Sequence, residues 1–425
     1  MADLRVKFCG IESPNPFWLA SGPPTNTGGQ VMRAFDAGWG GAVWKTIGEP
    51  IQNTSSRYGA IDYNGVKMMG LNNIELISDR PVEVNLREIA EVKRRYPKHL
   101  LIASLMVESK RETWHDIVRR AEDAGSDALE LNFGCPHGMS ERGMGAAVGQ
   151  VPEYTEMITS WAKEAARTPV ISKLTPNVTD IAHVARAAER GGADAVSLIN
   201  TINSLMGVDL ETFAPRPNVA GKSSHGGYCG PAVKPIALHL VSSVAKKVKI
   251  PIVGIGGIGN WIDTAEHISL GASVVQVCTA AMHYGFRIVE DMNDGLSAYM
   301  DDHGFRTIED FRGRAVPNVM DWGDLDLNYK IIARIDTKLC IGCQLCYVAC
   351  EDGAHQCIER ADVTNGGGKH NPNGMEVHVP RIIDEECVGC NLCALVCPVD
   401  GCITMEQFDT GLPPMSWKQK TSAAA

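Results

Sequence analysis

CIGCQLCYVAC at residues 340–350 and CVGCNLCALVC at residues 387–397 are two copies of one cysteine pattern. Each copy has the spacing C-x2-C-x2-C-x3-C, and Pro398 follows the second. The first three thiols of a copy are close enough in the chain to converge on one metal centre. The pattern therefore predicts a small module near the C-terminal end that is held together by metal–thiolate bonds.

This spacing is typical of a ferredoxin with two [4Fe–4S] clusters, in which the fourth cysteine of each run ligates the other cluster. A pair of zinc sites is the alternative, but tetrahedral zinc takes four ligands from two separated pairs. Glu351 rather than proline follows the first run, and no ligand is lost by this departure. The surplus Cys357 and Cys402 are interpreted as small buried apolar residues. The predicted ligand sets are Cys340, Cys343, Cys346 and Cys397 for one cluster, and Cys350, Cys387, Cys390 and Cys393 for the other.

Length and charge exclude several classes of protein. The chain of 425 residues can hold one domain of about 250–300 residues and a smaller one. Its net charge of −10, without a basic block, argues against a nucleic-acid partner. No apolar run approaches the roughly 20 residues of a membrane span, and residues 1–7 lack the apolar core of a secretory signal. Because cluster thiolates need a reducing compartment, we expect a cytoplasmic protein without disulfides.

Residues 1–302 repeat one pattern, in which a short apolar run of strand type is followed by a helical segment. Eight such units predict a (β/α)8 barrel. A doubly wound sheet is the alternative, but the glycine-rich 254–259 segment comes too late to be a leading dinucleotide fingerprint. We predict a linker or packing segment at 303–334, a ferredoxin-like domain at 335–412 and a flexible tail at 413–425. The predicted strands are Pro16–Gly22, Ala42–Gly48, Leu100–Met106, Asp127–Phe133, Pro169–Thr175, Ala195–Thr201, Pro251–Gly257 and Val274–Ala280.

Polar residues or glycines follow nearly every predicted strand, where a barrel carries its active site. Lys45 and Lys173 each stand inside an apolar run, so we expect their charges to point into a pocket rather than to solvent. Gly256 and Gly257, with Cys278 and Thr279 after the eighth strand, suit phosphate binding by backbone N–H groups. The other strand-end candidates are Ser21, Thr46, Asn132, Cys135, Asn200 and Thr201.

Iron–sulfur clusters carry single electrons, and a flavin is the usual converter to two-electron chemistry. We therefore expect FMN in the barrel, with Lys173 stabilising the negative charge of the reduced ring. Cys135 opens a glycine-rich loop, Cys135–Gly149, that could close over a substrate, and its thiol could exchange a proton with a substrate carbon. His137 is a second proton donor in principle, but we expect it to support the loop.

These motifs, from Lys45-Thr46 and Asn73–Ile77 through Asn132–Gly145 to both cysteine runs, resemble the dihydropyrimidine dehydrogenase family over nearly the whole chain. The likeness is to its FMN-barrel and C-terminal ferredoxin portions, and most of all to the FMN/iron–sulfur subunit of the bacterial NAD-dependent enzymes. It implies reversible reduction of uracil or thymine to the 5,6-dihydro product, with Cys135 protonating C5. It also implies pyrimidine contacts at Asn73, Asn132, Asn200 and Thr201. The implied FMN contacts are Ala20, Ser21, Lys45, Thr46, Lys173, Gly230, Gly256, Gly257, Cys278 and Thr279.

The family's single-chain members also carry an N-terminal region for FAD and NADPH, which this sequence lacks before the barrel. We therefore expect electrons from NADH to arrive through FAD on a partner flavoprotein subunit, and we also expect self-association. A dihydroorotate dehydrogenase-like enzyme is the first alternative, and a pure electron-transfer protein the second. No role is assigned to the segment Thr364–Gly374.

Overall fold

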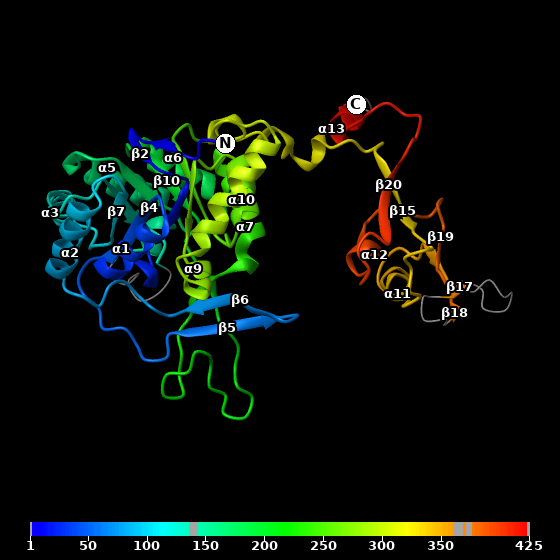
Figure 1. The fold of residues 1–425 in the computed structure, drawn as a ribbon, viewed down its shortest axis with the longest axis horizontal. Helices are drawn as coiled ribbons and strands as arrows, with labels where there is room; N and C mark the ends of the chain where they lie inside the picture. The colour runs from blue at the N-terminus through cyan, green and yellow to red at the C-terminus, as the bar shows by residue number, and fades with distance from the viewer. Residues whose placement is uncertain (1, 136–142, 361–368, 371–375, 423–425) are drawn as a thin grey trace. The chain divides into compact units, whose positions relative to one another are not determined.

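The computed structural model describes residues 2–135, 143–360, 369–370 and 376–422. The chain divides into two compact units, Met1–Val319 and Met320–Ala425 (Figure 1). The boundary lies inside the segment 303–334 that the sequence assigns to a linker. Residues before the boundary belong to the first unit, because the N–H groups of Gly313 and Ala315 donate to the carbonyls of Ile268 and Ser269, at 2.9 Å each.

The first unit contains a closed barrel of parallel strands in the order β10-β13-β14-β3-β4-β7-β8-β9. Parallel pairing of β9 with β10 closes the ring, which confirms the predicted (β/α)8 barrel and excludes the doubly wound sheet. Each strand overlaps one predicted run. The strands are β3 (Phe17–Leu19), β4 (Gly41–Ile47), β7 (Leu100–Leu105), β8 (Ala128–Asn132), β9 (Val170–Lys173), β10 (Ala195–Leu198), β13 (Ile252–Ile255) and β14 (Val274–Val277).

Helices cover the outside of the barrel (Figure 1). Their inner faces bury apolar side chains against the strands, and the large side chains of Trp18, Trp44 and Trp114 are almost wholly buried there. Each large apolar side chain buried in this layer contributes about 1.5–3 kcal/mol. The helices of this unit are α1 (Gly28–Ala37), α2 (Val82–Arg95), α3 (Arg111–Asp123), α4 (Ala146–Gly149), α5 (Pro152–Ala165), α6 (Ile181–Arg190), α7 (Lys234–Ala245), α8 (Trp261–Ser269), α9 (Thr279–Tyr284) and α10 (Ile288–Asp302).

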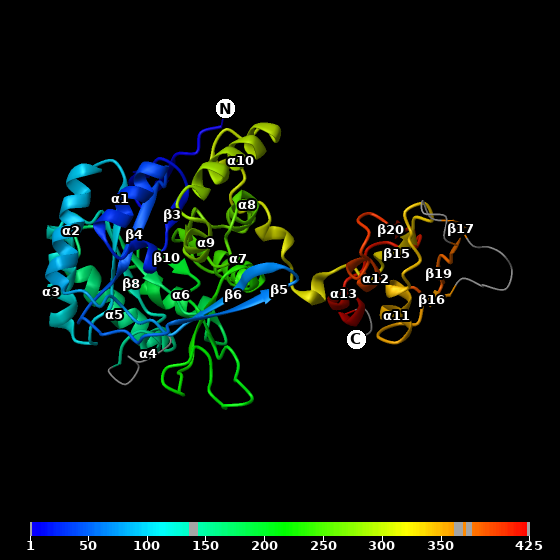
Figure 2. The same cartoon turned by 60° about the horizontal axis from the view of Figure 1, so that its bottom comes forward.

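A second, antiparallel sheet accompanies the barrel and is absent from our sequence prediction. Its strands pair in the order β11-β12-β6-β5, and β5 and β6 form a long pair in Figure 2. Gly70 of β6 leaves room for the Tyr228 ring of β12, because a Cβ there would lie 1.7 Å from the Tyr228 hydroxyl. The strands are β5 (Tyr58–Tyr63), β6 (Val66–Asn73), β11 (Ile202–Ser204) and β12 (Gly226–Cys229); a small hairpin of β1 (Val6–Phe8) and β2 (Ile11–Ser13) precedes the barrel.

The second unit consists of two similar halves. In each half a short helix follows the second cysteine of a run, and a glycine and an amide residue before it have positive φ: Gly342 and Gln344 in one half, Gly389 and Asn391 in the other. Of the segment Thr364–Gly374, only residues 369 and 370 lie inside the described part of the chain. The elements are β15 (Lys330–Ile335) paired with β20 (Ile403–Phe408), β16 (Ile358–Glu359) with β19 (Arg381–Ile382), β17 (Lys369–His370) with β18 (Glu376–Val377), and helices α11 (Leu345–Glu351), α12 (Leu392–Leu395) and α13 (Trp417–Ser422).

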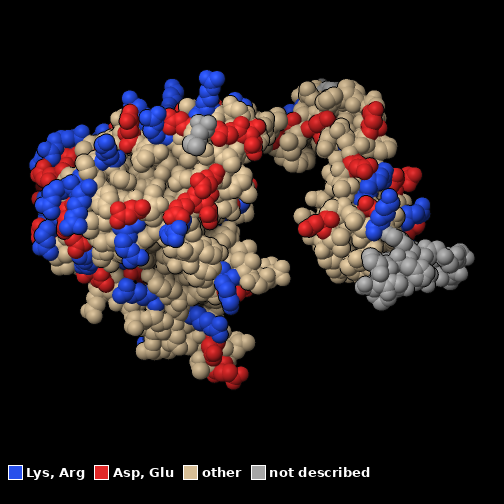
Figure 3. All heavy atoms as spheres, in the orientation of Figure 1, with Lys and Arg blue, Asp and Glu red and all other residues tan. Residues whose placement is uncertain are grey.

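The segment predicted as a flexible tail contains α13, and this helix contacts the start of the same unit. The rings of Trp417 and Trp322 lie 6.2 Å apart, and Lys418 pairs with Asp324 at 2.5 Å. Among the described residues, no helix combines the length and apolar character that a bilayer span requires. On the face drawn in Figure 3, basic and acidic side chains of the first unit are interspersed rather than gathered by sign.

Candidate functional site

A cavity of about 520 Å³ opens at the C-terminal ends of the barrel strands. All fifteen barrel residues that the sequence analysis assigned to FMN, substrate or catalysis line it. They come from the ends of the barrel strands and from β6 and the β12 segment of the antiparallel sheet. These residues are Ala20, Ser21, Lys45, Thr46, Asn73, Asn132, Cys135, Lys173, Asn200, Thr201, Gly230, Gly256, Gly257, Cys278 and Thr279.

A chain of hydrogen bonds fixes the two strand-end asparagines. Asn200 Nδ2 donates to Asn132 Oδ1 at 2.9 Å, and Asn132 Nδ2 donates to Thr46 Oγ1 at 3.0 Å. The backbone N–H groups of Thr201 and Gly134 donate to the two amide oxygens, at 2.9 and 3.2 Å. Because a backbone N–H can only donate, each amide must turn its oxygen toward it. Each NH2 group therefore keeps one hydrogen for an acceptor in the cavity.

Lys45 is buried and ion-paired with Glu75, at 2.6 Å between Nζ and Oε1. Arg57 reaches the same carboxylate at 2.8 Å, and the Tyr58 hydroxyl donates to its other oxygen at 2.6 Å. Burial opposes ionisation of Glu75, but Lys45, Tyr58 and Arg57 outweigh it and hold the pKa of this carboxyl below its usual value. Glu75 lies in the motif Asn73–Ile77, but its pairing with Lys45 was not predicted from the sequence.

Lys173 lies above a second carboxylate that sequence reasoning missed. Glu130 is in the middle of β8, wholly buried inside the barrel, and its Oε1 is 3.4 Å from Lys173 Nζ. Its Oε2 accepts hydrogen bonds from Ser197 Oγ on β10 and Gln276 Nε2 on β14, at 2.9 Å each. Gln276 also lines the cavity, and its buried Oε1 has no hydrogen-bond partner among the described residues. A lone acid within an apolar strand was the signal available in the sequence.

Glycines shape the cavity wall after β13. Gly256 and Gly257 have φ of 125° and 72°, in the left-handed region that favours glycine. A Cβ on Gly257 would lie 2.5 Å from Lys234 Cβ, so the backbone here approaches α7 as only glycine permits. Helix α9 begins at Thr279, directly after β14, and its first N–H groups have no partner inside the helix. This wall has the backbone donors that a phosphate group requires.

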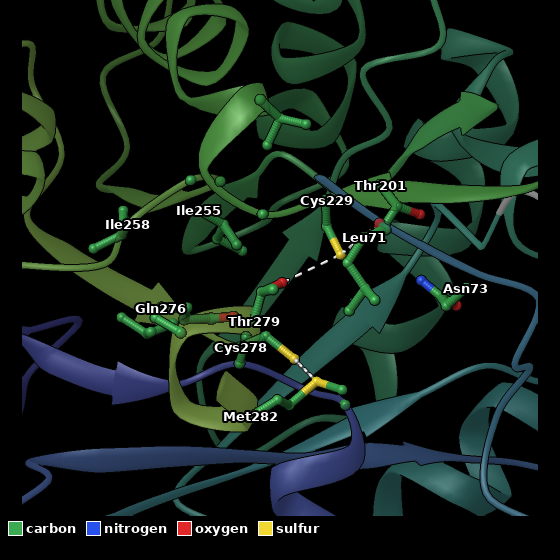
Figure 4. A pocket seen from close by; sticks show the side chains of 18 of the residues that line it. Leu71, Asn73, Thr201, Cys229, Ile255, Ile258, Gln276, Cys278, Thr279 and Met282 are labelled. Atoms are coloured by element: carbon green, nitrogen blue, oxygen red, sulfur yellow. Dashed lines mark hydrogen bonds between the residues drawn. The ribbon is translucent and has the colours of Figure 1, made fainter. Parts of the chain in front are cut away.

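Sulfur atoms line the same end of the cavity (Figure 4). The Thr279 hydroxyl donates to Cys229 Sγ at 3.2 Å, and the Cys278 thiol lies 3.9 Å from Met282 Sδ. Burial raises the pKa of Cys229 to about 11 and that of Cys278 to about 12, so both remain thiols near neutral pH. In this view Asn73 and Thr201 lie to the right of Cys229 and Leu71, across the cavity from Ile255 and Ile258.

Cys135 follows β8 and is buried beside Ile77, Met106 and Met144. Its carbonyl accepts from Ala146 N at 3.1 Å, which ties it to the start of α4. Residues 136–142, including His137 and Gly138, lie outside the described part of the chain. Of the predicted closing loop Cys135–Gly149, the described residues 143–149 end in helix α4, whose first residue bonds to Cys135.

In the second unit the run cysteines gather in two cavities. One is lined by Cys340, Cys343, Cys346 and Cys397, the other by Cys350, Cys387, Cys390 and Cys393. The exchange of the fourth thiol between runs is the division that the spacing predicts, and each donor set suits a [4Fe–4S] cluster. In the described residues, no group of three or more possible ligands is arranged to hold a single metal ion.

Comparisons with known proteins agree with both units. Residues 3–300 match the family described as "Dihydroorotate dehydrogenase", and residues 333–405 match a "4Fe-4S dicluster domain". The second match favours iron–sulfur clusters over the zinc alternative.

Three relatives share much of the chain. Over 366 residues it is 43% identical to the "NAD-dependent dihydropyrimidine dehydrogenase subunit PreA" of Escherichia coli, covering 85% of this chain and 89% of the relative. It is 43% identical to the chloroplastic "Dihydropyrimidine dehydrogenase (NADP(+))" of Arabidopsis thaliana, covering 74% and 77%. It is 36% identical to the "Dihydroorotate dehydrogenase B (NAD(+)), catalytic subunit" of Pyrococcus horikoshii, covering 74% and 98%.

Proposed function

The chain belongs to the dihydroorotate dehydrogenase family of oxidoreductases, and from this membership we propose that it is the catalytic subunit of a dihydropyrimidine dehydrogenase. In this proposal it reduces uracil or thymine reversibly to the 5,6-dihydro product. The observation that carries the proposal is a single cavity that combines oriented amide donors, a glycine wall for phosphate and a buried cysteine.

FMN fits the residues of the cavity. The cavity volume of about 520 Å³ is in the range of cofactor pockets. Gly256 and Gly257 with the start of α9 would hold the phosphate, and the unpartnered Gln276 Oε1 offers an acceptor to a ring N–H. Lys173 would stabilise negative charge on the reduced ring. When bound, FMN would supply hydride chemistry and convert single electrons into pairs.

The amide side chains suit a neutral pyrimidine. Asn132 and Asn200 each keep one N–H for a ring carbonyl, and Asn73 and Thr201 add polar groups to the same cavity. Dihydroorotate oxidation is the second candidate, because of the family match and the Pyrococcus horikoshii relative. The carboxylate of orotate would call for a cationic or amide contact, and an assay with orotate against uracil separates the two candidates. The three lysines among the described cavity residues already face carboxylates: Lys45 faces Glu75, Lys173 faces Glu130, and Lys234 faces Asp263. This pairing favours uracil and thymine over orotate.

Cys135 is the proposed acid. As hydride reaches C6 of the ring, the thiol gives its proton to C5 and becomes a thiolate, so one C=C bond is replaced by two C–H bonds. Solvent then returns a proton to the sulfur when the closing loop opens. Burial beside Met106 and Met144 keeps water away from the thiol during the transfer.

Electrons would come from NADH through FAD on a partner subunit and then through the two clusters. The relative from Escherichia coli is named as a subunit, which supports a partner for this chain. The need of cluster thiolates for a reducing compartment supports the cytoplasm as the location. Self-association stays a prediction.

The decisive experiment replaces Cys135 with Ala in protein loaded with flavin and iron. We expect uracil reduction to fall by about 10²–10⁴-fold while the flavin and iron contents stay at the wild-type level. Cys9→Ala, a cysteine outside the cavity, is the matched control. Equal turnover of uracil in the Cys135→Ala and control proteins would reject the acid role of Cys135. Absence of uracil turnover in the loaded wild-type protein would favour a pure electron-transfer protein. Faster turnover of orotate than of uracil by the wild type would favour the second candidate.

A further inference from the structure

Each cluster cavity is lined by a fifth cysteine beyond its four predicted ligands. Cys402 lines the first cavity and Cys357 the second. Their exposed fractions are 2% and 3%, which confirms the predicted burial. Each also lies beside the predicted ligands of its cavity, so its thiol can contact the cluster as well as fill space.

The two fifth cysteines occupy equivalent places in the two halves of the unit. The carbonyl of Cys402 accepts from Asp336 N at 2.7 Å, and that of Cys357 accepts from Ile383 N at 2.9 Å. Asp336 and Ile383 in turn accept from the N–H of the first cysteine of each run, at 3.0 and 2.9 Å. Each fifth cysteine directly precedes a strand, β20 or β16. The two thiols can therefore be compared at corresponding places in the two halves, although the N–H of Cys357 donates to Cys350 Sγ and that of Cys402 to the Val399 carbonyl.

The two thiols differ in the hydrogen-bond acceptors that are available to the S–H group. The Cys357 thiol has the carbonyls of Glu386 and His355 at 2.8 and 3.1 Å, and it also touches Cys350. The Cys402 thiol has its carbonyl contact, Asp336 O, only at 3.9 Å. The cavity places it beside the sulfurs of two predicted ligands, Cys397 and Cys340. Near neutral pH an unmodified cysteine carries its proton and can act as a donor.

We propose that Cys402 donates an S–H···S hydrogen bond to the ligand sulfurs of the first cluster, whereas the Cys357 proton is held by backbone carbonyls. A reduced cluster carries more negative charge, so a donor to its sulfurs stabilises the reduced form. Cys402 therefore raises the reduction potential of the cluster held by Cys340, Cys343, Cys346 and Cys397. Cys402 is a positioning residue in this sense, and the inference is independent of the substrate proposed for the barrel.

The test is a redox titration of both clusters in the full chain, followed by electron paramagnetic resonance. Cys402→Ala should lower one of the two midpoint potentials and leave the other near its wild-type value. Cys402→Ser keeps a donor and should restore most of the lost potential. Cys357→Ala is the matched control, and it should shift the potentials less because the backbone N–H of Cys357, which donates to Cys350 Sγ at 3.2 Å, is retained.

Iron and sulfide contents equal to wild type establish that each variant is loaded. Unchanged potentials in loaded Cys402→Ala, or an equal shift in Cys357→Ala, would overturn the proposal. If the alanine variant loses its clusters, Cys402→Val keeps the side-chain bulk without a donor and carries the same test. Loss of iron from both donor-free variants, with normal loading of Cys402→Ser, would assign Cys402 to cluster assembly instead and would also overturn it.

Discussion

Glu130 controls the charge that Lys173 presents to the cavity. The carboxylate lies 3.4 Å from the ammonium inside the barrel and is wholly buried. Glu130→Gln keeps the shape but removes the negative charge, so the positive charge of Lys173 acts undiminished on the reduced flavin. We expect the flavin midpoint potential to rise by on the order of 1 kcal/mol, roughly 20 mV for a two-electron couple. Equilibration with redox dyes measures the flavin midpoint potential.

Ser197→Ala is the control for this prediction. It removes one hydrogen bond to the same carboxylate, at 2.9 Å, and leaves the charge in place. Its potential should stay near the wild-type value. A fall in the potential of Glu130→Gln, or no change, would mean that Glu130 does not compensate Lys173 in the flavin-bound protein.

At the residue scale the sequence predicted the side chains that reach the cavity but not those that hold them. Lys45 and Lys173 could be predicted because a lysine inside an apolar strand run near the active end of a barrel is expected to turn its charge into a pocket. Glu75 and Glu130 were missed as their partners, because each becomes adjacent only through pairing of distant segments. A buried ammonium nevertheless requires a counter-charge, and the acid in the middle of the 127–133 run, Glu130, was the available sign.

The glycine wall after β13 is the element on which cofactor binding should depend. Gly257 has φ of 72°, and a Cβ there would lie 2.6 Å from Lys234 N on α7. Gly257→Ala should therefore lose most bound flavin and cost about 1–2 kcal/mol in stability. Gly65→Ala is the matched control, since Gly65 has φ of 79° with nothing within 4 Å of the added Cβ. It should cost the strain alone and keep its flavin.

Flavin content after gel filtration and thermal unfolding measure this pair of variants. Equal flavin in both proteins would show that the wall after β13 is not needed for the cofactor. The Gly257→Ala protein should lose more stability than the Gly65→Ala protein. Equal losses would mean that crowding against α7 adds nothing to the backbone strain at Gly257.

The barrel strands could be predicted as elements and the second sheet could not. Parallel strands buried on both faces read as continuous apolar runs, and every residue of β4, β7 and β13 is buried. Strand β5 is almost entirely exposed and so has no hydrophobic period. Its sheet also joins segments from two distant parts of the chain, β5–β6 and β11–β12, whose pairing no local pattern encodes.

At the scale of the whole molecule, the repeated cysteine pattern made the second unit predictable from the sequence. Because the two runs share one spacing, the crossed thiol sets followed from the sequence, and the two cavities have that membership. The unequal surroundings of Cys357 and Cys402 did not follow, since they depend on carbonyl positions rather than on residue type. The repeated pattern therefore predicted the two ligand sets. It did not predict the difference between Cys357 and Cys402 that would affect electron transfer through the clusters.

The chain as a whole should need a partner before NADH can reduce it. NADH alone should leave its flavin and cluster absorbance unchanged over many minutes, while dithionite-reduced viologen should bleach both and support uracil reduction. The reason is that the proposed path places hydride acceptance from NADH on FAD of another subunit, and the clusters accept single electrons only. Anaerobic absorbance spectroscopy is the measurement, with an added FAD-containing NADH dehydrogenase subunit as the restoring control. Rapid bleaching by NADH in the purified chain would instead place the nicotinamide site on this polypeptide.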